Sequence, residues 1–565
     1  MVRRFGVVPL LLFVLCSVTA APFSQSSSAF SSRPAPSWEP APLLSDTTQL
    51  GIVWTPPSRP DPALRELNRI DSLGATAVRL TRPPSDAVAA RADTLGLRLY
   101  VDLPIDHVSA QNLQDALARA TPTLKRLRTL ARQHPSIARV GLARAADTTV
   151  PAACNTLRRW HDRVRSWTGS LRTYYVTPFI AASDRCLDAV DQVLLDVRGH
   201  PTPVDRWRQW QSRTATVGLG AVGTWVRPSA GSGLRTPHSP ERQARYLERT
   251  LSRLLDATKA SPPVIFVSRW RDQPSSVLPT RRYGLHDPDG RPRPAARVVQ
   301  GIYTGTQRVF AFSSGTEPGT GRYGLLLVGW GLIALLGGLY ARSPFVRQTV
   351  LRYFAAPGFY RDTLRDGHNL APGANGLLAG LVTAAIGTTG ICAFSLAATE
   401  PETEHVLGAL PPPVQTLLAR GIEHPITAGV TIGGLVLSLL GVWMGTLVLA
   451  TRLQTQLSLA QGLVLVTWPC WPTLLALPLA LAAGPDAPLS PFWLTVLLLI
   501  GGGLAFLYMT GRVLYDYWVI TDLPAPIVLL LGALSPFALI SATVLVLTAW
   551  YDVSIVFLWH LATQT

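Results

Sequence analysis

The stretch LRELNRIDSLGATAVRL, residues 64–80, contains the pattern that decides the fold of the first part of the chain. Apolar residues in its first part recur at the spacing of one helical face, at Leu64, Leu67, Ile70 and Leu73. Its last four residues, Ala77–Leu80, form a short and mostly apolar run that is typical of a buried strand. The stretch therefore predicts a helix that leads directly into a strand.

The same alternation of helix and strand continues along the chain to Tyr303. Short apolar or β-branched runs predict eight strands, at Leu50–Trp54, Ala77–Leu80, Leu97–Asp102, Ala138–Leu142, Thr173–Thr177, Gln192–Asp196, Ala215–Gly220 and Pro263–Ser268. Eight strands that alternate with helices over about 250 residues are typical of a (β/α)₈ barrel. A doubly wound open sheet is the alternative, but the count of eight favours a barrel, which we place at residues 49–305.

Six long apolar runs follow, and the first begins at Tyr323. Because an apolar helix of about 20 residues spans a bilayer, we predict transmembrane helices at residues 323–341, 375–398, 426–451, 458–484, 492–513 and 526–551. The predicted fold class is thus a (β/α)₈ TIM barrel followed by an all-α six-helix transmembrane region. The remaining divisions are a linker at 306–322, an Arg-rich cytoplasmic loop at 342–374 and a five-helix membrane domain at 375–565.

Two short motifs within these spans concern helix packing. The sequence WPCWP, residues 468–472, predicts a break in the fourth span because proline interrupts a helix. Gly441 and Gly445 form a GxxxG pair, which is a candidate face for close helix packing.

Charged residues are nearly absent from the spans, whereas transporters place ionisable groups at membrane depth. Transport is therefore the least favoured function for this region.

The charges of the loops predict an orientation in the membrane. The loop after the first span carries Arg342, Arg347, Arg352, Arg361 and Arg365, the strongest positive-inside signal of the chain. The next loop carries acidic residues that suit the outer side, at Glu402, Glu404 and Glu423. We therefore expect the predicted barrel and the C-terminus to lie outside the cytoplasm.

The first 21 residues have the features of a secretory signal peptide. Arg3 and Arg4 precede an apolar segment, Val7–Val18, and the small residues around Ala20 form a cleavage site. Residues 22–48 are rich in Ser and Pro and predict a linker. We expect a protein of the cytoplasmic (inner) membrane that crosses it several times and exposes its barrel in the periplasm.

Composition limits the partners. The chain of 565 residues has a formal net charge of +17, but its arginines are spread along the sequence rather than gathered in basic tracts, so we expect no nucleic-acid partner. The histidines lack metal-ligand spacing, so we expect neither a metal nor a cofactor. Cys154 and Cys186 are the two cysteines of the predicted barrel, and outside the cytoplasm they are candidates for a disulfide.

Several segments of the predicted barrel have counterparts in one family. They are Gly51–Trp54, Leu73–Leu80, Ala92–Leu97, Asp102–Pro104, His134–Ile137, Ser239–Leu247, Trp270–Asp272 and Tyr283–Pro292. In order and spacing they resemble the barrels of the large retaining superfamily of glycoside hydrolases, including the β-galactosidase and β-glucuronidase family. This resemblance implies that the functional residues lie on the loops that follow the strands.

The segment Tyr353–Arg361, YFAAPGFYR, precedes five of the predicted spans. It resembles the beginning of Yip1-like five-helix membrane domains. That resemblance implies a packing or scaffolding bundle rather than a catalyst.

The glycosidase resemblance implies two catalytic glutamates, because a retaining glycosidase uses one carboxyl group as acid/base and a second as nucleophile. The first is expected after the fourth strand, where this chain has Gly141–Asp147 and no glutamate. The second is expected at the end of the seventh strand, where Ala221 stands. Since alanine can neither attack nor transfer a proton, we predict that the two-glutamate mechanism is lost and the barrel is degenerate.

Four aspartates are candidates for a replacement mechanism: Asp147 as acid, and Asp102, Asp196 or Asp272 as nucleophile or base. Each also has a structural interpretation, since aspartates at strand ends often pair with buried arginines or cap helices. Asp272 could pair with its neighbour Arg271. The sequence leaves both interpretations open.

Four further residues are candidate ligand contacts. Trp54, Trp225 and Trp270 have ring faces on which a sugar can stack, although each is equally a candidate core residue. The resemblance implies that Arg79 is the arginine that normally holds the nucleophile. Without that glutamate its charge is available to pair with Asp102 or with an anionic ligand.

These observations lead to one hypothesis and two main alternatives. The hypothesis is that a membrane-anchored, degenerate barrel recognises a glycan or a cell-wall carbohydrate. The first alternative is an active glycosidase with displaced aspartates. The second is a scaffold in which the barrel binds protein partners. In each case the expected partners include the lipid bilayer.

Overall fold

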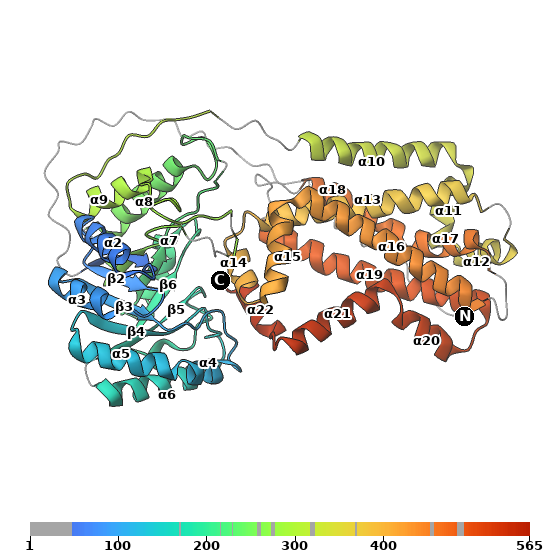
Figure 1. The fold of residues 1–565 in the computed structure, drawn as a ribbon. Helices are drawn as coiled ribbons and strands as arrows, with labels where there is room; N and C mark the ends of the chain where they lie inside the picture. The colour runs from blue at the N-terminus through green and yellow to red at the C-terminus, as the bar shows by residue number, and fades with distance from the viewer. Residues whose placement is uncertain are drawn as a thin grey trace. The chain divides into compact units, whose positions relative to one another are not determined.

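The computed structural model describes residues 48–565 except 169–170, 215, 229, 257–260, 273–276, 279, 317–322, 368–369, 452–456 and 483–490. The predicted signal peptide and nearly all of the first linker lie outside the described residues. Within the described chain, a barrel comes first and a helical region follows it (Figure 1).

Eight parallel strands close into a barrel in the order of the sequence, and β1 pairs with β8 (Figure 1). The strands are β1 Gln49–Trp54, β2 Ala77–Leu80, β3 Arg98–Asp102, β4 Ile137–Arg144, β5 Arg172–Thr177, β6 Gln192–Asp196, β7 Gly218–Val222 and β8 Val264–Val267. Because the sheet closes on itself, the predicted barrel is confirmed and the open-sheet alternative is excluded. The seventh strand begins at Gly218, three residues later than the predicted start at 215, and it includes Ala221.

Helices cover the outside of the barrel, as the residue spacing predicts. They are α2 Pro60–Ser72, α3 Asp86–Leu95, α4 Leu113–Arg119, α5 Thr121–Gln133, α6 Pro151–Thr168, α7 Pro203–Gln211, α8 Pro240–Leu254 and α9 Pro294–Tyr303. Ser85 and Ser239 cap α3 and α8, because each side chain accepts a hydrogen bond from the backbone three residues on. Between β5 and β6 the described chain has only the short 3₁₀ turn η1, Leu187–Ala189.

Aromatic side chains fill the inside of the barrel. Tyr100 and Phe266 meet edge to face with ring centroids 4.9 Å apart, and Tyr174 lies 5.6 Å from Tyr100. Gly51 makes room for them, since a Cβ atom there would lie 2.5 Å from the Phe266 ring. The interior is therefore a packed core and not a channel, as expected for an eight-stranded barrel.

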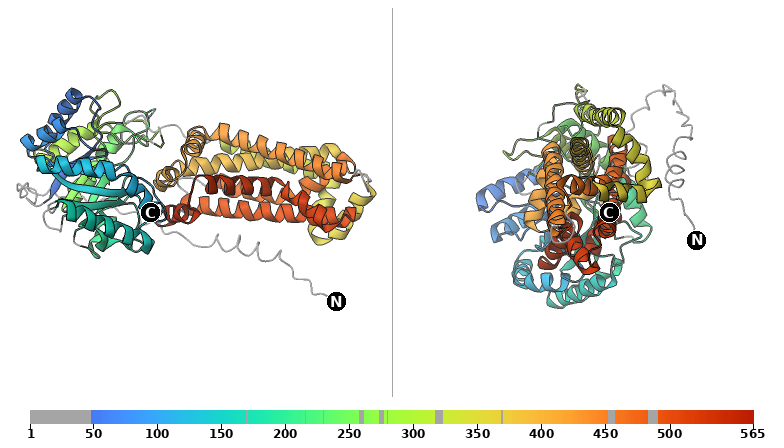
Figure 2. Two further views of the ribbon diagram at one scale, coloured as in Figure 1. Left: turned by 60° about the horizontal axis from the view of Figure 1, so that its bottom comes forward. Right: turned by 90° about the vertical axis from the view of Figure 1, so that its right-hand side faces the viewer.

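The helical region begins at Tyr323. Its helices are α10 Tyr323–Arg342, α11 Pro344–Ala355, α12 Pro357–Asp366, α13 Pro372–Ala397, α14 Glu402–Gly408, α15 Pro412–Glu423, α16 Pro425–Thr451, α17 Leu459–Thr467, α18 Ala476–Ala482, α19 Pro491–Thr521, α20 Ala525–Ala533, α21 Pro536–Trp550 and α22 Ile555–Thr563. The motif WPCWP begins a 3₁₀ segment, η2 Trp468–Leu475, between α17 and α18. The long helices α13, α16 and α19 lie side by side (Figure 2).

Three helical segments of the described residues are long and apolar enough to cross a membrane: Pro372–Ala397, Pro425–Thr451 and Leu459–Pro478. The number rises to five if each of two bent helix pairs is one span, namely Leu326–Arg342 with Pro344–Val350 and Ala525–Ala533 with Pro536–Trp550. The predicted span at 492–513 falls within α19. A helical, largely apolar region is thus confirmed, while the count of six spans stays a prediction.

Glycines set the closest approach between two of the long helices. A Cβ atom at Gly387 of α13 would lie 2.6 Å from the carbonyl oxygen of Gly429 of α16. The GxxxG residues Gly441 and Gly445 have open space instead, with no described atom within 4 Å of a Cβ atom built on either. Close packing therefore uses other glycines than the motif indicated.

Candidate functional site

The carboxyl ends of the strands gather polar side chains around a buried ion pair. Arg79 of β2 and Asp102 of β3 are 2% and 1% exposed. Arg79 donates from Nε to Asp102 Oδ1 over 3.1 Å and from Nη2 to Oδ2 over 2.8 Å. This two-point geometry fixes both side chains. The structure thus pairs Arg79 with Asp102, one of the two partners that the sequence left open.

Neighbouring strands complete this network. The Tyr174 hydroxyl of β5 donates to Asp102 Oδ1 over 2.6 Å, and Arg79 Nη1 donates to the Gly220 carbonyl of β7 over 2.8 Å. Burial, together with the negative Asp102 carboxylate, raises the pKa of Tyr174 well above its usual value. Gly141 of β4 leaves the necessary space, since its Cβ would lie 2.7 Å from the Tyr174 ring. The network is closed on all sides by this chain's own groups.

A second ion pair lies at the end of β6. Asp196 accepts hydrogen bonds from Nε of Arg198 over 2.8 Å and from Nη2 over 2.7 Å. Burial alone would raise the pKa of Asp196, but the Arg198 guanidinium holds that pKa well below its usual value. Asp196 is therefore a charged partner of arginine at any ordinary pH.

A third group of charges follows β3 and β4. Arg144 Nη2 donates to Asp106 Oδ2 over 2.5 Å, and His107 Nδ1 lies 3.0 Å from Asp106 Oδ1. The Arg144 guanidinium and the neighbouring His107 hold the pKa of Asp106 well below its usual value. In the loops that follow the strands, three residues other than glycine have a positive φ: His107, Ala145 and Arg269. Such strained backbone is concentrated at functional sites in proteins.

One helix of the C-terminal region contacts these charges. Glu404 of α14 lies 3.5 Å from Arg198 Nη1 through Oε1 and accepts a hydrogen bond from the Tyr283 hydroxyl over 2.8 Å through Oε2. His405 Nδ1 lies 3.4 Å from His107 Nε2. We name the site formed by Arg144, Arg198, Tyr283 and His107 the barrel mouth. Glu404 and His405 thus contact three of these four residues, namely Arg198, Tyr283 and His107.

No pattern in the sequence predicts this contact. The charge of Glu404 indicates only the side of the membrane on which its loop is expected, and Glu404 lies 206 residues from Arg198. Tyr283 lies in a segment of the family resemblance. Neither position predicts that a short helix between two long apolar helices reaches the barrel. Only the folded arrangement brings the two residues together.

The three candidate tryptophans are buried, with exposed fractions of 4% or less. Trp54 donates from Nε1 to Glu66 of α2 over 2.7 Å. Trp225 stacks on His238 with ring centroids 3.4 Å apart, and the Trp270 ring lies 4.1 Å from that of His286. In this conformation none of these three rings presents an open face at the barrel mouth.

Two of the four candidate aspartates have side-chain partners outside the barrel mouth. Asp147 is buried and accepts hydrogen bonds from Thr149 over 2.6 Å and from His560 of α22 over 3.1 Å. Asp272 pairs with Arg293 over 2.5 Å, and not with its neighbour Arg271, which pairs with Glu66 instead. Asp102 and Asp196 are the last residues of β3 and β6, whereas Asp147 and Asp272 lie in the loops that follow β4 and β8.

Ala221 is buried inside the barrel near the end of β7, at the position where the resemblance places a nucleophile. Cys154 and Cys186 form a disulfide between α6 and the segment before η1. Among the described residues, no cluster of three or more His, Cys, Asp or Glu side chains could hold a metal ion.

The fold defines a class of protein: an eight-stranded (β/α)₈ barrel followed by a helical, largely apolar region. No protein-family model and no curated protein sequence matches the chain. Among solved structures, it is similar to a GH2 β-galacturonidase from Eisenbergiella tayi, with 17% identity, a TM-score of 0.41 and coverage of 46% of this chain and 52% of that chain.

Two further solved structures are similar to a comparable degree. An uncultured Clostridium β-glucuronidase has 14% identity and a TM-score of 0.40, with 46% of this chain and 50% of that chain covered. A β-D-glucuronidase of Dictyoglomus thermophilum has 14% identity and a TM-score of 0.38, with 46% and 51% covered. The chain spans about half the length of these enzymes. At such identities the likeness concerns the fold alone.

Proposed function

We propose that this protein is a membrane-anchored barrel that recognises a carbohydrate outside the cytoplasm and does not hydrolyse it by the two-glutamate mechanism. The observation that carries the proposal is the buried Ala221 at the end of β7. A retaining glycosidase needs two carboxyl groups about 5 Å apart at this end of the barrel. Gly141–Asp147, after the fourth strand, likewise supplies no glutamate.

The aspartates at this end are poorly suited to replace the missing glutamates. Asp102 is bound at both oxygens by Arg79, and Asp196 is bound at both oxygens by Arg198. A catalytic acid or base works best with a pKa near the operating pH. The lowered pKa of Asp196 is far from that condition. These pairs favour recognition over the displaced-aspartate glycosidase.

Recognition requires the barrel mouth to open. Arg198, Tyr283 and His107 are the polar groups that a sugar's hydroxyl or acidic substituents could use, and Glu404 and His405 contact them now. A ligand at the barrel mouth would therefore displace α14. Since α14 follows the apolar helix α13 closely in the chain, its release would connect ligand binding to the helical region.

The remaining parts of the proposal concern the setting of the protein. We propose six spans, an N-terminal signal peptide, a periplasmic barrel and a location in the cytoplasmic membrane. The arginine-rich loop at 342–374 and the acidic loop around α14 support this orientation.

A glycan array tests the proposal with full-length protein in detergent, and the eluates are analysed for released sugars. The variant Glu404→Gln weakens the contact with Arg198 and should bind the same glycans more strongly than the unaltered protein. Glu423→Gln, on α15, is the matched control and should behave as the unaltered protein does. Binding without release supports the proposal. Release of sugar, abolished by Asp102→Asn with Asp147→Asn in a folded protein, would instead establish the glycosidase.

A protein scaffold is the second candidate, and the occupied barrel mouth favours it. Leu407 of α14 is 3% exposed and packs in one apolar cluster with Leu278, Ala419 and Ile422. Such burial is what a permanent joint between the barrel and the helices would require. If both the unaltered protein and Glu404→Gln bind no glycan, while membrane partners co-purify with the full chain and not with a chain lacking the barrel, the scaffold replaces recognition.

A further inference from the structure

A second buried charge cluster lies in the helical region, far in sequence from the barrel. Asp516 of α19 is fully buried, and two arginines reach it from different elements. Arg361 of α12 contacts Oδ1 through Nε over 2.8 Å, and Arg512, one turn earlier on α19, contacts Oδ2 through Nε over 3.0 Å. Two positive charges thus meet one negative charge, so this cluster, the Asp516 cluster, has an excess of one positive charge.

The two arginines are held near the surface. Their side chains are 18% and 20% exposed, whereas Asp516 is not exposed at all. The guanidinium of Arg361 lies 4.6 Å from the centre of the Tyr515 ring, and that of Arg512 lies 5.4 Å from the centre of the Tyr353 ring. Asp516 and the rings fix the positions of both cations. Each guanidinium has further N–H donors on its terminal nitrogens.

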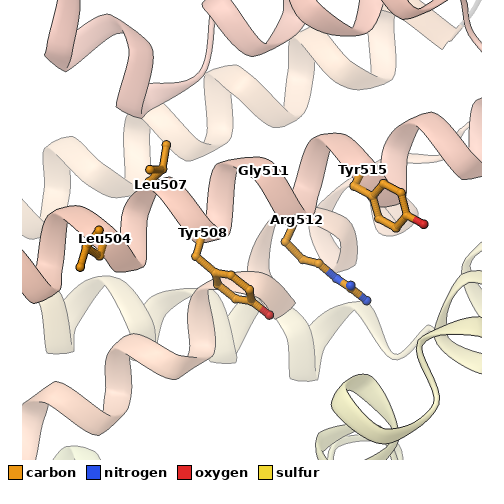
Figure 3. Close-up of a pocket in the computed structure, with 6 residues that line it drawn as sticks. All are labelled: Leu504, Leu507, Tyr508, Gly511, Arg512 and Tyr515. Atoms are coloured by element: carbon orange, nitrogen blue, oxygen red, sulfur yellow. The ribbon is translucent and has the colours of Figure 1, made fainter. Parts of the chain in front are cut away.

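An open groove on α19 includes one of these arginines, Arg512, and Tyr515, whose ring lies against the other. It has a volume of about 420 Å³ and is lined by Leu504, Leu507, Tyr508, Gly511, Arg512 and Tyr515. Figure 3 shows the order along the helix: the two leucines lie at one end, and Arg512 and Tyr515 lie at the other. Gly511 keeps the middle open, because no described atom lies within 4 Å of a Cβ atom built there.

The groove is complementary to an anionic phospholipid, because its apolar half matches an acyl chain and its cationic end matches a phosphate. We propose that it binds an anionic phospholipid, with an acyl chain along Leu504 and Leu507 and the phosphate at Arg512 and Arg361. Arginine suits phosphate because its planar donors match the phosphate oxygens. The excess positive charge favours an anionic over a zwitterionic headgroup.

The predicted orientation agrees with this ligand. Arg361 lies in the loop assigned to the cytoplasmic side, and the cytoplasmic leaflet of membranes carries anionic lipids. The inference rests on the proposal that the helical region spans a membrane. It is independent of whether the barrel binds a glycan.

Retention of lipid tests the proposal. The full-length protein is incorporated into nanodiscs made with equal parts of phosphatidylglycerol and phosphatidylcholine, purified in detergent, and analysed by native mass spectrometry. We expect phosphatidylglycerol to be retained about fivefold over phosphatidylcholine, since one arginine near an anionic surface contributes on that scale. Arg361→Gln together with Arg512→Gln should abolish the preference. Arg365→Gln on the same helix α12, where the arginine is 57% exposed, should keep it.

A second variant tests the groove without touching the charges. Gly511→Trp should fill the groove and reduce retention of phosphatidylglycerol, while the Asp516 cluster stays intact. Gly502→Trp is the matched control, because nine residues along the helix place it on the opposite side, and a Cβ atom there also meets open space. Equal retention of the two lipids by the unaltered protein would overturn the proposal. So would an unchanged preference in Gly511→Trp.

Discussion

Two buried aspartates, one in each region of the molecule, are paired with arginine in different ways. Asp102 in the barrel is bound at both oxygens by Arg79, which is itself 2% exposed, and Nε of a second arginine, Arg144, lies 3.8 Å from its Oδ2. Asp516 in α19 is bound by two arginines, one at each oxygen, and both of these reach the surface. The first arrangement uses up its donors within the chain, whereas the second leaves positive charge at an open groove. A buried ion pair therefore stabilises the fold in the barrel, whereas in the helical region it positions positive charge at the proposed lipid site.

The cause of the difference is the geometry of the surrounding elements. In the barrel, groups from four strands converge on Asp102 and Arg79, so a tyrosine hydroxyl and a backbone carbonyl complete the network. On α19 the partners come from one helix and from the short helix α12. The side chains of these arginines remain 18% and 20% exposed, so their outer sides are accessible.

Asp102→Asn should have the largest effect, because Arg79 would keep its charge in the barrel interior without a counter-charge. We expect the free energy of unfolding to fall by about 3–5 kcal/mol. Denaturant unfolding of the full-length protein in detergent, followed by tryptophan fluorescence, measures this. Asp205→Asn removes two surface ion pairs and is the control, with an expected loss below about 1 kcal/mol. Equal losses of unfolding free energy in the two variants would mean that the Arg79–Asp102 pair stabilises the barrel no more than a surface ion pair does.

Removal of the disulfide should rank second. Cys154 and Cys186 close a loop between positions 32 apart, and Cys154→Ser with Cys186→Ser should cost about 2–4 kcal/mol. The same unfolding experiment with and without reductant provides the control. Reductant should destabilise the unaltered protein and have no effect on the double variant. A double variant as stable as the unaltered protein would contradict the expectation.

Asp516→Asn should cost less than Asp102→Asn, because the arginines that lose their partner already reach the surface. We expect a loss of about 1–3 kcal/mol, the scale of a hydrogen bond to a charged group. Thermal unfolding in detergent compares the two variants directly. The same change adds to the positive charge of the groove, so retention of phosphatidylglycerol should stay the same or rise. A larger loss of stability than in Asp102→Asn would reverse the comparison.

A further expected effect is a pH dependence of the contact between α14 and the barrel mouth. Burial is the main cause that lowers the pKa of His405 to about 4, and nearby His107 and Arg198 lower it further. An unfolded histidine binds a proton near pH 6.5, whereas the docked one does so only near pH 4. Docking is therefore fully stable above about pH 6.5 and loses stability as the pH falls toward 4, by at most about 1.4 kcal/mol per pH unit.

Hydrogen exchange of the α14 backbone between pH 7 and pH 4.5, corrected for intrinsic rates, measures this dependence. His405→Gln should remove most of it, whereas His424→Gln, at an exposed position, should leave it unchanged. Asp106 and Asp196 do not contribute in this range, because their pKa values are held well below it. Protection of α14 that does not change with pH would show that His405 is not neutral when docked.

The periodicity of the sequence determined the barrel. The periodicities that indicate helices and strands involve residues close together in the sequence. A stretch such as residues 64–80 therefore contains a complete helix pattern and a complete strand pattern. The ends of the strands were predicted less accurately. The seventh strand was expected to end at Gly220, whereas β7 extends to Val222 and includes Ala221. A shift of register between β6 and β7 accompanies this difference, and pairing between strands cannot be read from one strand alone.

The sequence also determined which residue types are available: arginines in excess, aspartates at strand ends, leucines and tyrosines on one face of α19. Only the tertiary structure decided their partners. Asp272 pairs with Arg293 and not with adjacent Arg271, and Glu404 reaches Arg198 across 206 residues. Local patterns fix helices and strands because the interactions are short in sequence. Ion pairs form between whichever charges the closed barrel and the packed helices bring within about 4 Å, and that choice depends on the complete fold.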